Sequence, residues 1–277
     1  MGVTGRERVV LHLVTKQNRA LYRAELENLH RVRKSVFVDE LGWRLNIENG
    51  LEIDQYDDDE AMYGIGFDSA GRISMSGRYR PTIHGSMLAD VFAHSLDVGV
   101  DSLHGEHVWE FSRGFCLETG GKRHNQQRRA MLMLTPLELA YAHGVTSYIA
   151  FSEVRLLPLF INMGWRVNLL GDPVSYGEGE GIAYRVEVSE EAIQSMRRAY
   201  DLPTPCYIYL QEDPNDPRDV HERALDIARR APEYASILPQ PTDRPYVPRN
   251  LQVRRVDETR LRRRAFDWAK ENQAVNI

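Results

Sequence analysis

The sequence has only two cysteines, Cys116 and Cys206. So few cysteines exclude a disulfide-stapled scaffold and a cysteine-rich zinc module, and they fit a reducing compartment. Long apolar runs are also missing, because the longest uncharged one, from Leu139 to Ser152, is too short to span a bilayer. The first eight residues contain no apolar core, so we expect neither a signal peptide nor a membrane span. Together these absences predict a cytoplasmic protein.

Positive charge and glycine-rich binding motifs are scarce as well. The chain has 35 basic and 40 acidic residues and a formal net charge of -5, which argues against a nucleic-acid partner. It contains no dinucleotide-binding glycine turn, no Walker loop and no Gly-x-Ser-x-Gly motif. The acidic run from Glu52 to Glu60 lacks the central glycine and final glutamate of a calcium loop. We therefore expect no metal site.

What is present is the pattern of a packed α/β domain. Hydrophobic residues make up 42% and charged residues 27%, as is usual for a globular chain. Short apolar runs alternate with segments whose apolar residues follow helical spacing. This alternation predicts strands over 9–14, 61–67, 72–79, 107–117, 147–151, 165–170 and 181–188, and helices over 16–39, 125–143 and 154–162 and after Ser189.

The composition changes near residue 200, where prolines become frequent. We place a catalytic domain at 1–200 and a proline-rich, partly helical C-terminal extension at 201–277. Short helices are expected over 220–230 and 257–270. An arm folded over the core or into a partner subunit, and a partly disordered tail, all fit this composition. We expect a chain truncated near residue 200 to keep some activity.

Four sets of residues could carry chemistry, and the first lies in the early helical region. Arg33 and Phe37 are four positions apart, so they share one face of a helix, and Trp43 follows. An arginine beside aromatic rings can hold a carboxylate while the rings cover an apolar or cationic group. A helix that merely packs on a core is the plain alternative.

The second and third sets have opposite charges. Asp54 and Asp57 lie in the acidic run, and Arg78 stands just before Pro81, which ends a strand. The plain alternatives are a solvated loop and a surface arginine. If Arg78 is buried, however, it needs carboxylate partners, and the two aspartates are the obvious candidates.

The fourth set lies in an aromatic-rich strand. Alternation places Glu110 and Ser112 on one face, with Trp109, Phe111 and Arg113 on the other. A glutamate flanked by aromatic residues is a candidate general base or ion-pair partner. A glutamate on a solvated sheet face is the alternative.

Taken in order and spacing, these sets resemble the LuxI-type acyl-homoserine-lactone synthases, the autoinducer synthases of bacterial quorum sensing. The resemblance covers roughly residues 8 to 190, and the extension has no counterpart in it. The residues that carry it are Arg33, Phe37, Trp43, Asp54, Asp57, Arg78, Met87, Leu88, Asp90, Val91, Phe92, Glu110, Ser112 and Arg113.

The resemblance implies a three-layer α/β/α sandwich like the GNAT N-acyltransferase fold. It also implies two substrates, S-adenosylmethionine (SAM) and an acyl thioester on acyl carrier protein or coenzyme A (CoA), with no bound cofactor. The SAM amine attacks the thioester, and the methionyl carboxylate then closes the lactone and expels methylthioadenosine (MTA). A weaker likeness around Trp165 and Pro173 points to relatives that use acyl-CoA.

The resemblance also suggests roles for individual residues. Glu110 would act as the base through a bridging water, and Arg33 would hold the SAM carboxylate. The SAM pocket would be walled by Phe37 and Trp43. The ion network around Glu110 would contain Asp54, Asp57, Arg78, Ser112 and Arg113, and the acyl pocket Phe151, Ser152, Leu156 and Phe160.

One geometric consequence concerns Glu110 and Arg113, which a regular strand would send to opposite faces. The resemblance puts both in one cluster, so we expect a bulge or strand break between Phe111 and Gly114. Two other functions remain open: a GNAT-type acetyltransferase using acetyl-CoA, and a non-catalytic ligand-binding relative. A regulatory role of the extension fits either.

Overall fold

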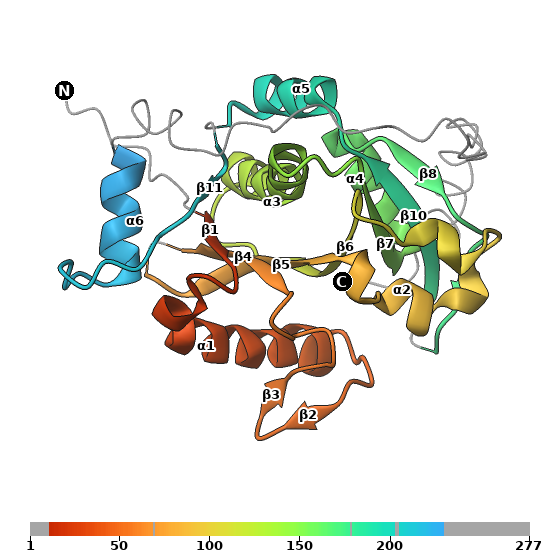
Figure 1. Cartoon of the computed structure of the whole chain (residues 1–277), viewed down its shortest axis with the longest axis horizontal. Coiled ribbons are helices and arrows are strands. Elements are labelled where there is room, and N and C mark those ends of the chain that lie inside the picture. Colours follow the sequence, from red (N-terminus) through yellow and green to blue (C-terminus); the bar gives the residue numbers. More distant parts are fainter. Residues whose placement is uncertain (1–10, 69, 178, 203–204, 230–277) are drawn as a thin grey trace. The chain divides into compact units, whose positions relative to one another are not determined.

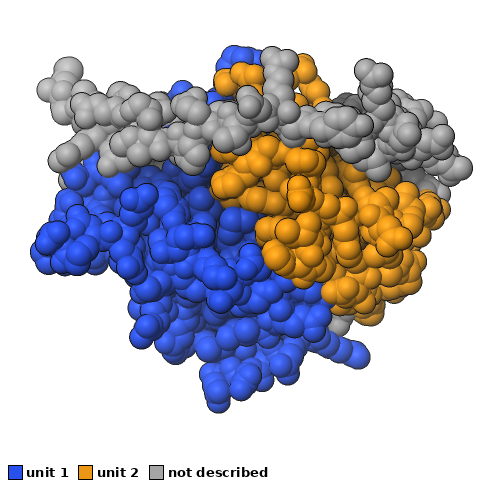
Figure 2. Space-filling model, in the orientation of Figure 1, with its two compact units in different colours: residues 1–80, 112–138, 197–240 blue, residues 81–111, 139–196, 241–277 orange. Residues whose placement is uncertain are grey.

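The computed structural model describes residues 11–68, 70–177, 179–202 and 205–229. The chain forms two compact units, coloured separately in Figure 2. The predicted helix over 257–270 lies outside the described residues. Of the described residues, those within 11–80, 112–138 and 197–229 belong to unit 1, and those within 81–111 and 139–196 belong to unit 2.

The sheet of unit 1 confirms the expected hairpin. Strands β4 (Met62–Phe67) and β5 (Ile73–Pro81) pair antiparallel. The turn between them closes where Gly71 donates its N–H to the carbonyl of Asp68 at 2.9 Å. The strand order is β11-β1-β4-β5-β6, with β1 at Leu11–Val14, β6 at Val108–Cys116 and β11 at Tyr207–Ile208.

Helices cover both faces of this sheet, which gives unit 1 three layers (Figure 1). On one face, η1 (Arg19–Tyr22) leads into α1 (Arg23–Arg33) and then into a π-helix, η2 (Lys34–Glu40). On the other face lies α3 (Lys122–Ala142). The sequence predicted helix over 16–39 but not the π-helix. A small hairpin, β2 (Ile47–Glu48) and β3 (Leu51–Glu52), follows η2.

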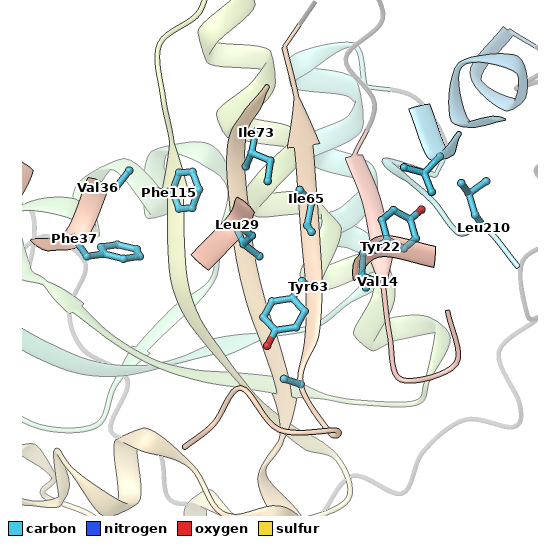
Figure 3. Packing of buried hydrophobic residues seen from close by; sticks show 12 residues of the cluster. Val14, Tyr22, Leu29, Val36, Phe37, Tyr63, Ile65, Ile73, Phe115 and Leu210 are labelled. Atoms are coloured by element: carbon cyan, nitrogen blue, oxygen red, sulfur yellow. The ribbon is translucent and has the colours of Figure 1, made fainter. Parts of the chain in front are cut away.

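The core of unit 1 joins the helices, the strands and the extension. Figure 3 shows this cluster spreading across the strands from Phe37 to Leu210. Leu29 of α1 packs with Ile65 and Ile73 of the sheet, and all three are at most 4% exposed. Burying such side chains is the main favourable term in folding.

Unit 2 is built on the strand order β6-β7-β10-β8. The β6–β7 pair is parallel, whereas β10 pairs antiparallel with β7, β8 and β9. Its strands are β7 (Ser147–Glu153), β8 (Val167–Leu169), β9 (Val174–Ser175) and β10 (Glu180–Glu187).

The helices of unit 2 are short. Helix α4 (Leu157–Met163) ends at Gly164, whose left-handed φ of 114° suits glycine. As predicted, Ser189 caps α5 (Glu190–Tyr200), because its hydroxyl accepts the N–H of Ala192 at 3.4 Å. The remaining helical turns are η3 (Thr82–His84), α2 (Met87–Asp90), η4 (Ala93–Ser95), η5 (Val100–Leu103) and η6 (Val154–Leu156).

The first part of the extension belongs to unit 1. Strand β11 pairs parallel with β1, and α6 (Val220–Arg229) places Val220 in the same core as Leu210. The sequence predicted a helix over 220–230, and the structure has one there. In the described part of the chain, no helix is long and apolar enough to cross a membrane.

Candidate functional site

Three arginines and three carboxylates of unit 1 form a closed ring of alternating charge, which we call the charge ring. Each member contacts two neighbours of opposite sign, so the ring is neutral when all six groups are ionised. Its order is Arg33, Glu52, Arg113, Asp54, Arg78, Asp57 and back to Arg33.

Two of these contacts are bidentate, the strongest geometry for an arginine and a carboxylate. The Arg33 guanidinium donates to both oxygens of Asp57, at 2.6 and 2.9 Å. The Arg78 guanidinium donates to both oxygens of Asp54, at 2.5 and 3.0 Å, and its Nε donates to the Ser112 hydroxyl at 3.0 Å. The predicted pairing of Arg78 with the two aspartates is therefore present.

The charge ring is buried except at one member. The side chains of Arg33, Glu52, Asp57 and Arg78 are each 1% exposed, whereas that of Asp54 is 20% exposed. A buried charge is tolerated only when it is paired and hydrogen-bonded, and the ring meets both conditions. Asp54 is thus the member through which the ring can meet a ligand.

The arginines determine the ionisation of Asp57. Burial alone would raise the pKa of this carboxyl group, but the charges of Arg78 and Arg33 outweigh burial and hold the pKa well below its usual value. The hydroxyl of Tyr63 also donates to Asp57 at 2.9 Å. Burial and the nearby Asp57 charge raise the pKa of Tyr63, so Tyr63 stays a donor. Asp57 therefore remains ionised at neutral pH.

Arg113 reaches the ring because its strand is irregular. Its φ is 53°, a left-handed value that is rare for a residue other than glycine. The parallel pairing of β6 with β7 ends just before, at Glu110 and Ile149. The backbone therefore deviates from regular strand geometry at Arg113, within the stretch where a bulge or break was predicted, while β6 itself continues to Cys116. This deviation turns Arg113 toward Glu52, whose carboxylate accepts from the guanidinium at 3.0 Å.

An aromatic pair adjoins the ring. The rings of Phe37 and Trp43 stack with centroids 4.9 Å apart and planes inclined by 17°. The Arg113 guanidinium lies 5.9 Å from the Phe37 centroid. The π-helix positions this pair, since the N–H of Trp43 bonds back to the carbonyl of Phe37 at 2.8 Å. Inserted π-turns of this kind often occur at functional sites.

The guanidinium N–H groups of Arg33 are already engaged by carboxylates of the charge ring. An arginine carries five N–H groups, and those of Arg33 point to Glu52 and Asp57 through all three nitrogens. The side chain is also almost fully buried. A direct contact with a substrate carboxylate would have to compete with these bonds, so that role of Arg33 stays a prediction.

Glu110 lies in unit 2 and is 2% exposed. Its two carboxylate oxygens accept the backbone N–H groups of Met87 and Leu88, at 2.9 and 2.7 Å. These amides begin α2, so the glutamate satisfies helix donors that would otherwise lack partners. The bonds hold the carboxylate in one orientation. Its proposed approach to the same cavity as Arg113 stays a prediction.

The four residues expected in the acyl pocket do not share one surface. Phe151 and Ser152 are neighbours on β7, and Leu156 and Phe160 lie in the helical segments η6 and α4 that follow it. Ser152 pairs with Ile182 and Phe151 with Ala183, and neighbouring residues of a strand face opposite sides. The Phe151 ring stacks on Phe92 at 3.9 Å. Phe160 instead contacts Trp165, and Leu156 is 37% exposed.

Glu52 is the one member of the ring that was not expected from the sequence. The expected network contained two arginines, Arg78 and Arg113, and left Arg33 outside it as the holder of the SAM carboxylate. The structure instead brings Arg33 into the ring, and a third buried arginine requires a further carboxylate, which Glu52 provides. Among the described residues, no group of three or more His, Cys, Asp or Glu side chains is arranged to hold a metal ion.

Comparisons with known proteins agree with this geometry. A family model described as autoinducer synthase matches residues 17–196. The isovaleryl-homoserine lactone synthase of Bradyrhizobium diazoefficiens is 29% identical over 198 residues, which are 70% of this chain and 87% of that protein. The acyl-homoserine-lactone synthase of Ralstonia nicotianae is 34% identical over 149 residues, 52% of this chain and 72% of that protein.

A solved structure extends the likeness to the fold. It is a CoA-dependent acyl-homoserine lactone synthase with MTA, 26% identical, and it covers 79% of this chain and 99% of its own. Its TM-score is 0.65. A second structure of that enzyme, with SAM and isopentyl-CoA, has a TM-score of 0.64, the same identity and the same coverage of both chains. The expected three-layer α/β fold is thereby confirmed.

Proposed function

The chain belongs to the autoinducer synthase family, and we propose that it is an acyl-homoserine-lactone synthase that uses SAM and an acyl thioester. The observation that carries the proposal is the charge ring beside the Phe37–Trp43 stack. The family match spans every member of both. The charges of this cluster cancel, and its ion pairs hold the side chains in place. Such a cluster suits a site that must position a charged substrate without changing its own protonation state or geometry.

The aromatic pair provides the SAM-binding wall. SAM carries a sulfonium cation next to an adenosine ring, and aromatic faces attract cations and stack on flat rings. Trp43 is only partly buried, whereas Phe37, on which it stacks, is buried. The ring member Asp54, whose side chain is partly exposed, would face the amine of the same substrate.

The first chemical step is acylation of the SAM amine. The amine must lose a proton before it attacks the thioester carbonyl, and the thiol leaves as the new amide forms. We assign the base to Glu110, acting through a water. Its bonds to the backbone N–H groups of Met87 and Leu88 fix the orientation in which the carboxylate would meet that water.

The second step closes the lactone. The methionyl carboxylate attacks the γ-carbon of its own chain, the carbon–sulfur bond breaks, and MTA leaves with the electron pair. The step needs close positioning more than acid or base help, because nucleophile and leaving group belong to one molecule. The site must therefore hold SAM in a bent conformation, a task for the aromatic wall and the exposed edge of the charge ring.

The acyl donor is a CoA thioester in this proposal. Support comes from the solved structures described as CoA-dependent synthases, which match this chain at 26% identity. An acyl carrier protein is the other candidate donor. The reaction is placed in the cytoplasm, where SAM and thioesters are made and where free thiols such as Cys116 and Cys206 stay reduced.

The proposal is tested by incubating the full chain with SAM and matched acyl-CoA and acyl-carrier-protein thioesters. We expect mass spectrometry to detect MTA and an acyl-homoserine lactone in equal amounts with the CoA donor. MTA formed only with the carrier-protein donor would overturn the choice of donor. Acyl transfer from acetyl-CoA to an unrelated amine, without MTA, would favour the acetyltransferase alternative.

Replacing Glu110 by glutamine should lower kcat by about 10²–10⁴-fold, the usual contribution of a general base. The side chain keeps nearly the same volume, but its amide nitrogen cannot accept a backbone N–H, so one of the two bonds to α2 is lost. Thermal denaturation should still show a folded protein, of slightly lower stability. The loss of kcat should shrink as pH rises, because the SAM amine then deprotonates without help. A loss that is equal at every pH would mean that Glu110 only supports α2.

Replacing Trp43 by alanine should weaken SAM binding about tenfold or more and leave the KM for the acyl donor nearly unchanged. The variant removes the less buried ring of the aromatic stack, which contributes about 1–2 kcal/mol in cation–π and stacking energy. Calorimetric titration with SAM measures the first effect and initial-rate kinetics the second. A change confined to the acyl donor would move Trp43 out of the SAM pocket.

A further inference from the structure

The extension contacts a buried histidine of the first strand. His12 of β1 is 2% exposed, and three rings lie around its imidazole. The distances between ring centroids are 5.7 Å to Tyr22, 4.9 Å to Phe67 and 5.7 Å to His221. Tyr22 belongs to η1 and Phe67 to β4, whereas His221 comes from α6, which packs beside β11 at the edge of the sheet (Figure 1). This His12 cluster therefore connects α6 to three other elements of unit 1.

Helix α6 contributes a partly exposed member of the cluster. The His221 side chain is 32% exposed, and its ring meets the Phe67 ring edge to face, with centroids 4.2 Å apart. Val220 and Ala224 of the same helix are buried, so the helix turns this side toward the core. Displacement of α6 would therefore take away one of the three rings around His12 and admit water to its imidazole.

His12 is held neutral while α6 is in place. Burial, together with the neighbouring His221, lowers the pKa of His12 to about 3. The Nδ1 atom of His12 lies 3.2 Å from the Tyr22 hydroxyl, and burial raises the pKa of that hydroxyl, so it stays protonated. Among the described residues, no carboxylate contributes to the pKa of His12. An imidazolium at this position would therefore be buried without a negative charge to offset it.

The other titratable groups nearby act on different members of the cluster. The Glu25 carboxylate of α1 lies 3.9 Å from Nε2 of His221. A proton on His221 would thus be met by a negative charge, so His221 can take it up with α6 in place. Three further influences act on the Tyr22 hydroxyl, from Glu25, Arg223 and Tyr209. His12 is therefore the one member of the cluster whose protonation requires α6 to move.

We propose that α6 is a proton-sensitive latch, which closes over His12 at neutral pH and opens as the solution is acidified. In the open state His12 meets water, and an exposed imidazole has a pKa of about 6.5. Below that pH the open state binds one proton more than the closed state. The open population therefore rises by up to about tenfold for each pH unit below about 6.5, and above that pH the latch does not respond.

Opening of the latch would weaken the support of the charge ring. Val220 of α6 and Leu29 of α1 belong to the same core, and α1 ends at Arg33, which binds Glu52 and Asp57 of the ring. Acid could thus reach the ring through α1, without titrating any of its members. The family model ends at residue 196, so α6 lies beyond it. The latch is accordingly a property of this chain that goes beyond the proposed function.

Hydrogen–deuterium exchange of the full chain tests the latch. Exchange is followed by mass spectrometry between about pH 5 and pH 8, the range in which histidine titrates, and is corrected for the intrinsic effect of pH on amide exchange. Opening of peptides from 220–229 should rise by up to about tenfold per pH unit below about 6.5. Peptides from α3, on the other face of the sheet, should change much less. An equal rise in both would mean global unfolding and would overturn the latch.

Two substitutions remove the proposed proton acceptor. His12→Leu replaces the imidazole by an apolar side chain, and His12→Asn keeps a polar atom that can face the Tyr22 hydroxyl, in case the leucine variant does not fold. Either folded variant should lose the acid-dependent rise in exchange over 220–229. A rise of the original size in a folded His12→Asn or His12→Leu protein would show that His12 does not control α6, and the proposal would be wrong.

The matched control is His221→Asn. It removes the other imidazole of the cluster but leaves His12 in place, so α6 should open more readily at every pH while the acid-dependent rise stays. Loss of the rise in this variant, with His12 intact, would assign the response to His221 and overturn the proposal as stated. The measurement uses no substrate, so its outcome is independent of whether the protein releases MTA.

Discussion

Replacing Arg78 by alanine is expected to abolish lactone formation. The substitution leaves Asp54 and Asp57 without the guanidinium that binds both, and it removes the donor to Ser112. Breaking a buried ion pair on one side costs about 3–5 kcal/mol. Asp54 keeps Arg113 and Asp57 keeps Arg33, but the ring is left with three carboxylates for two arginines, so one buried negative charge is uncompensated. Even where the fold survives, a displacement of about 1 Å in the site can cost about a hundredfold in rate.

Arg80 provides the matched control for Arg78. It lies two residues further along β5 and pairs with Asp58, whose side chain is 38% exposed. Arg80→Ala should therefore lower stability modestly and keep most of the activity, since water can solvate Asp58. Thermal denaturation and MTA release are measured for both variants. Near-normal turnover in a folded Arg78→Ala protein would remove the charge ring from the mechanism.

The sequence made the charge ring largely predictable, and the reason is electrostatic. A buried arginine requires carboxylates, so the sequence alone was enough to match Arg78 with Asp54 and Asp57. The irregularity at Arg113 was predicted in a similar way. Glu110 and Arg113 were expected in one cluster, although a regular strand would place them on opposite faces of the sheet. Charge partners and strand periodicity are local rules that a sequence states directly.

Other parts could not be predicted from the sequence, because they depend on long-range packing. The π-helix after α1 has no periodic signal that separates it from an ordinary helix, yet it positions Phe37 against Trp43. The two faces of β7 separate Phe151 from Ser152, although the acyl pocket was predicted to contain both. Glu110 binds the backbone N–H groups at the start of α2. Every residue except proline has such a group, so the sequence does not show which residues will bind Glu110.

The boundary of the catalytic domain was also hard to predict from the sequence. Its prolines suggested an appendage, and we expected a chain truncated near residue 200 to keep some activity. The structure instead places Leu210 and Val220 in the core of unit 1. Asn18, which is fully buried, donates to the carbonyls of Leu13 and Leu210 at 3.0 and 2.9 Å. The segment from 205 to 229 therefore completes a core that the first 200 residues leave open.

Truncation after residue 200 is accordingly expected to prevent stable folding of unit 1. It removes Tyr207, Leu210 and Val220, each at most 6% exposed. Each such side chain contributes about 1.5–3 kcal/mol by burial, and their sum is comparable to the whole stability of an ordinary domain, about 5–15 kcal/mol. The truncation also takes β11 from the edge of the sheet and removes the Cys206 N–H that binds the buried Glu138 at 2.8 Å.

Circular dichroism and thermal denaturation of the truncated chain measure the effect, and a chain that ends after residue 229 isolates the segment responsible. The longer chain keeps β11 and α6 and should unfold in a cooperative transition, whereas the shorter one should show none. Leu210→Ala in the full chain is a milder form of the same change and should cost about 2–5 kcal/mol. If the chain that ends at residue 200 folds cooperatively and still releases MTA, the extension is an appendage after all, and its contacts with Asn18 and Glu138 contribute little.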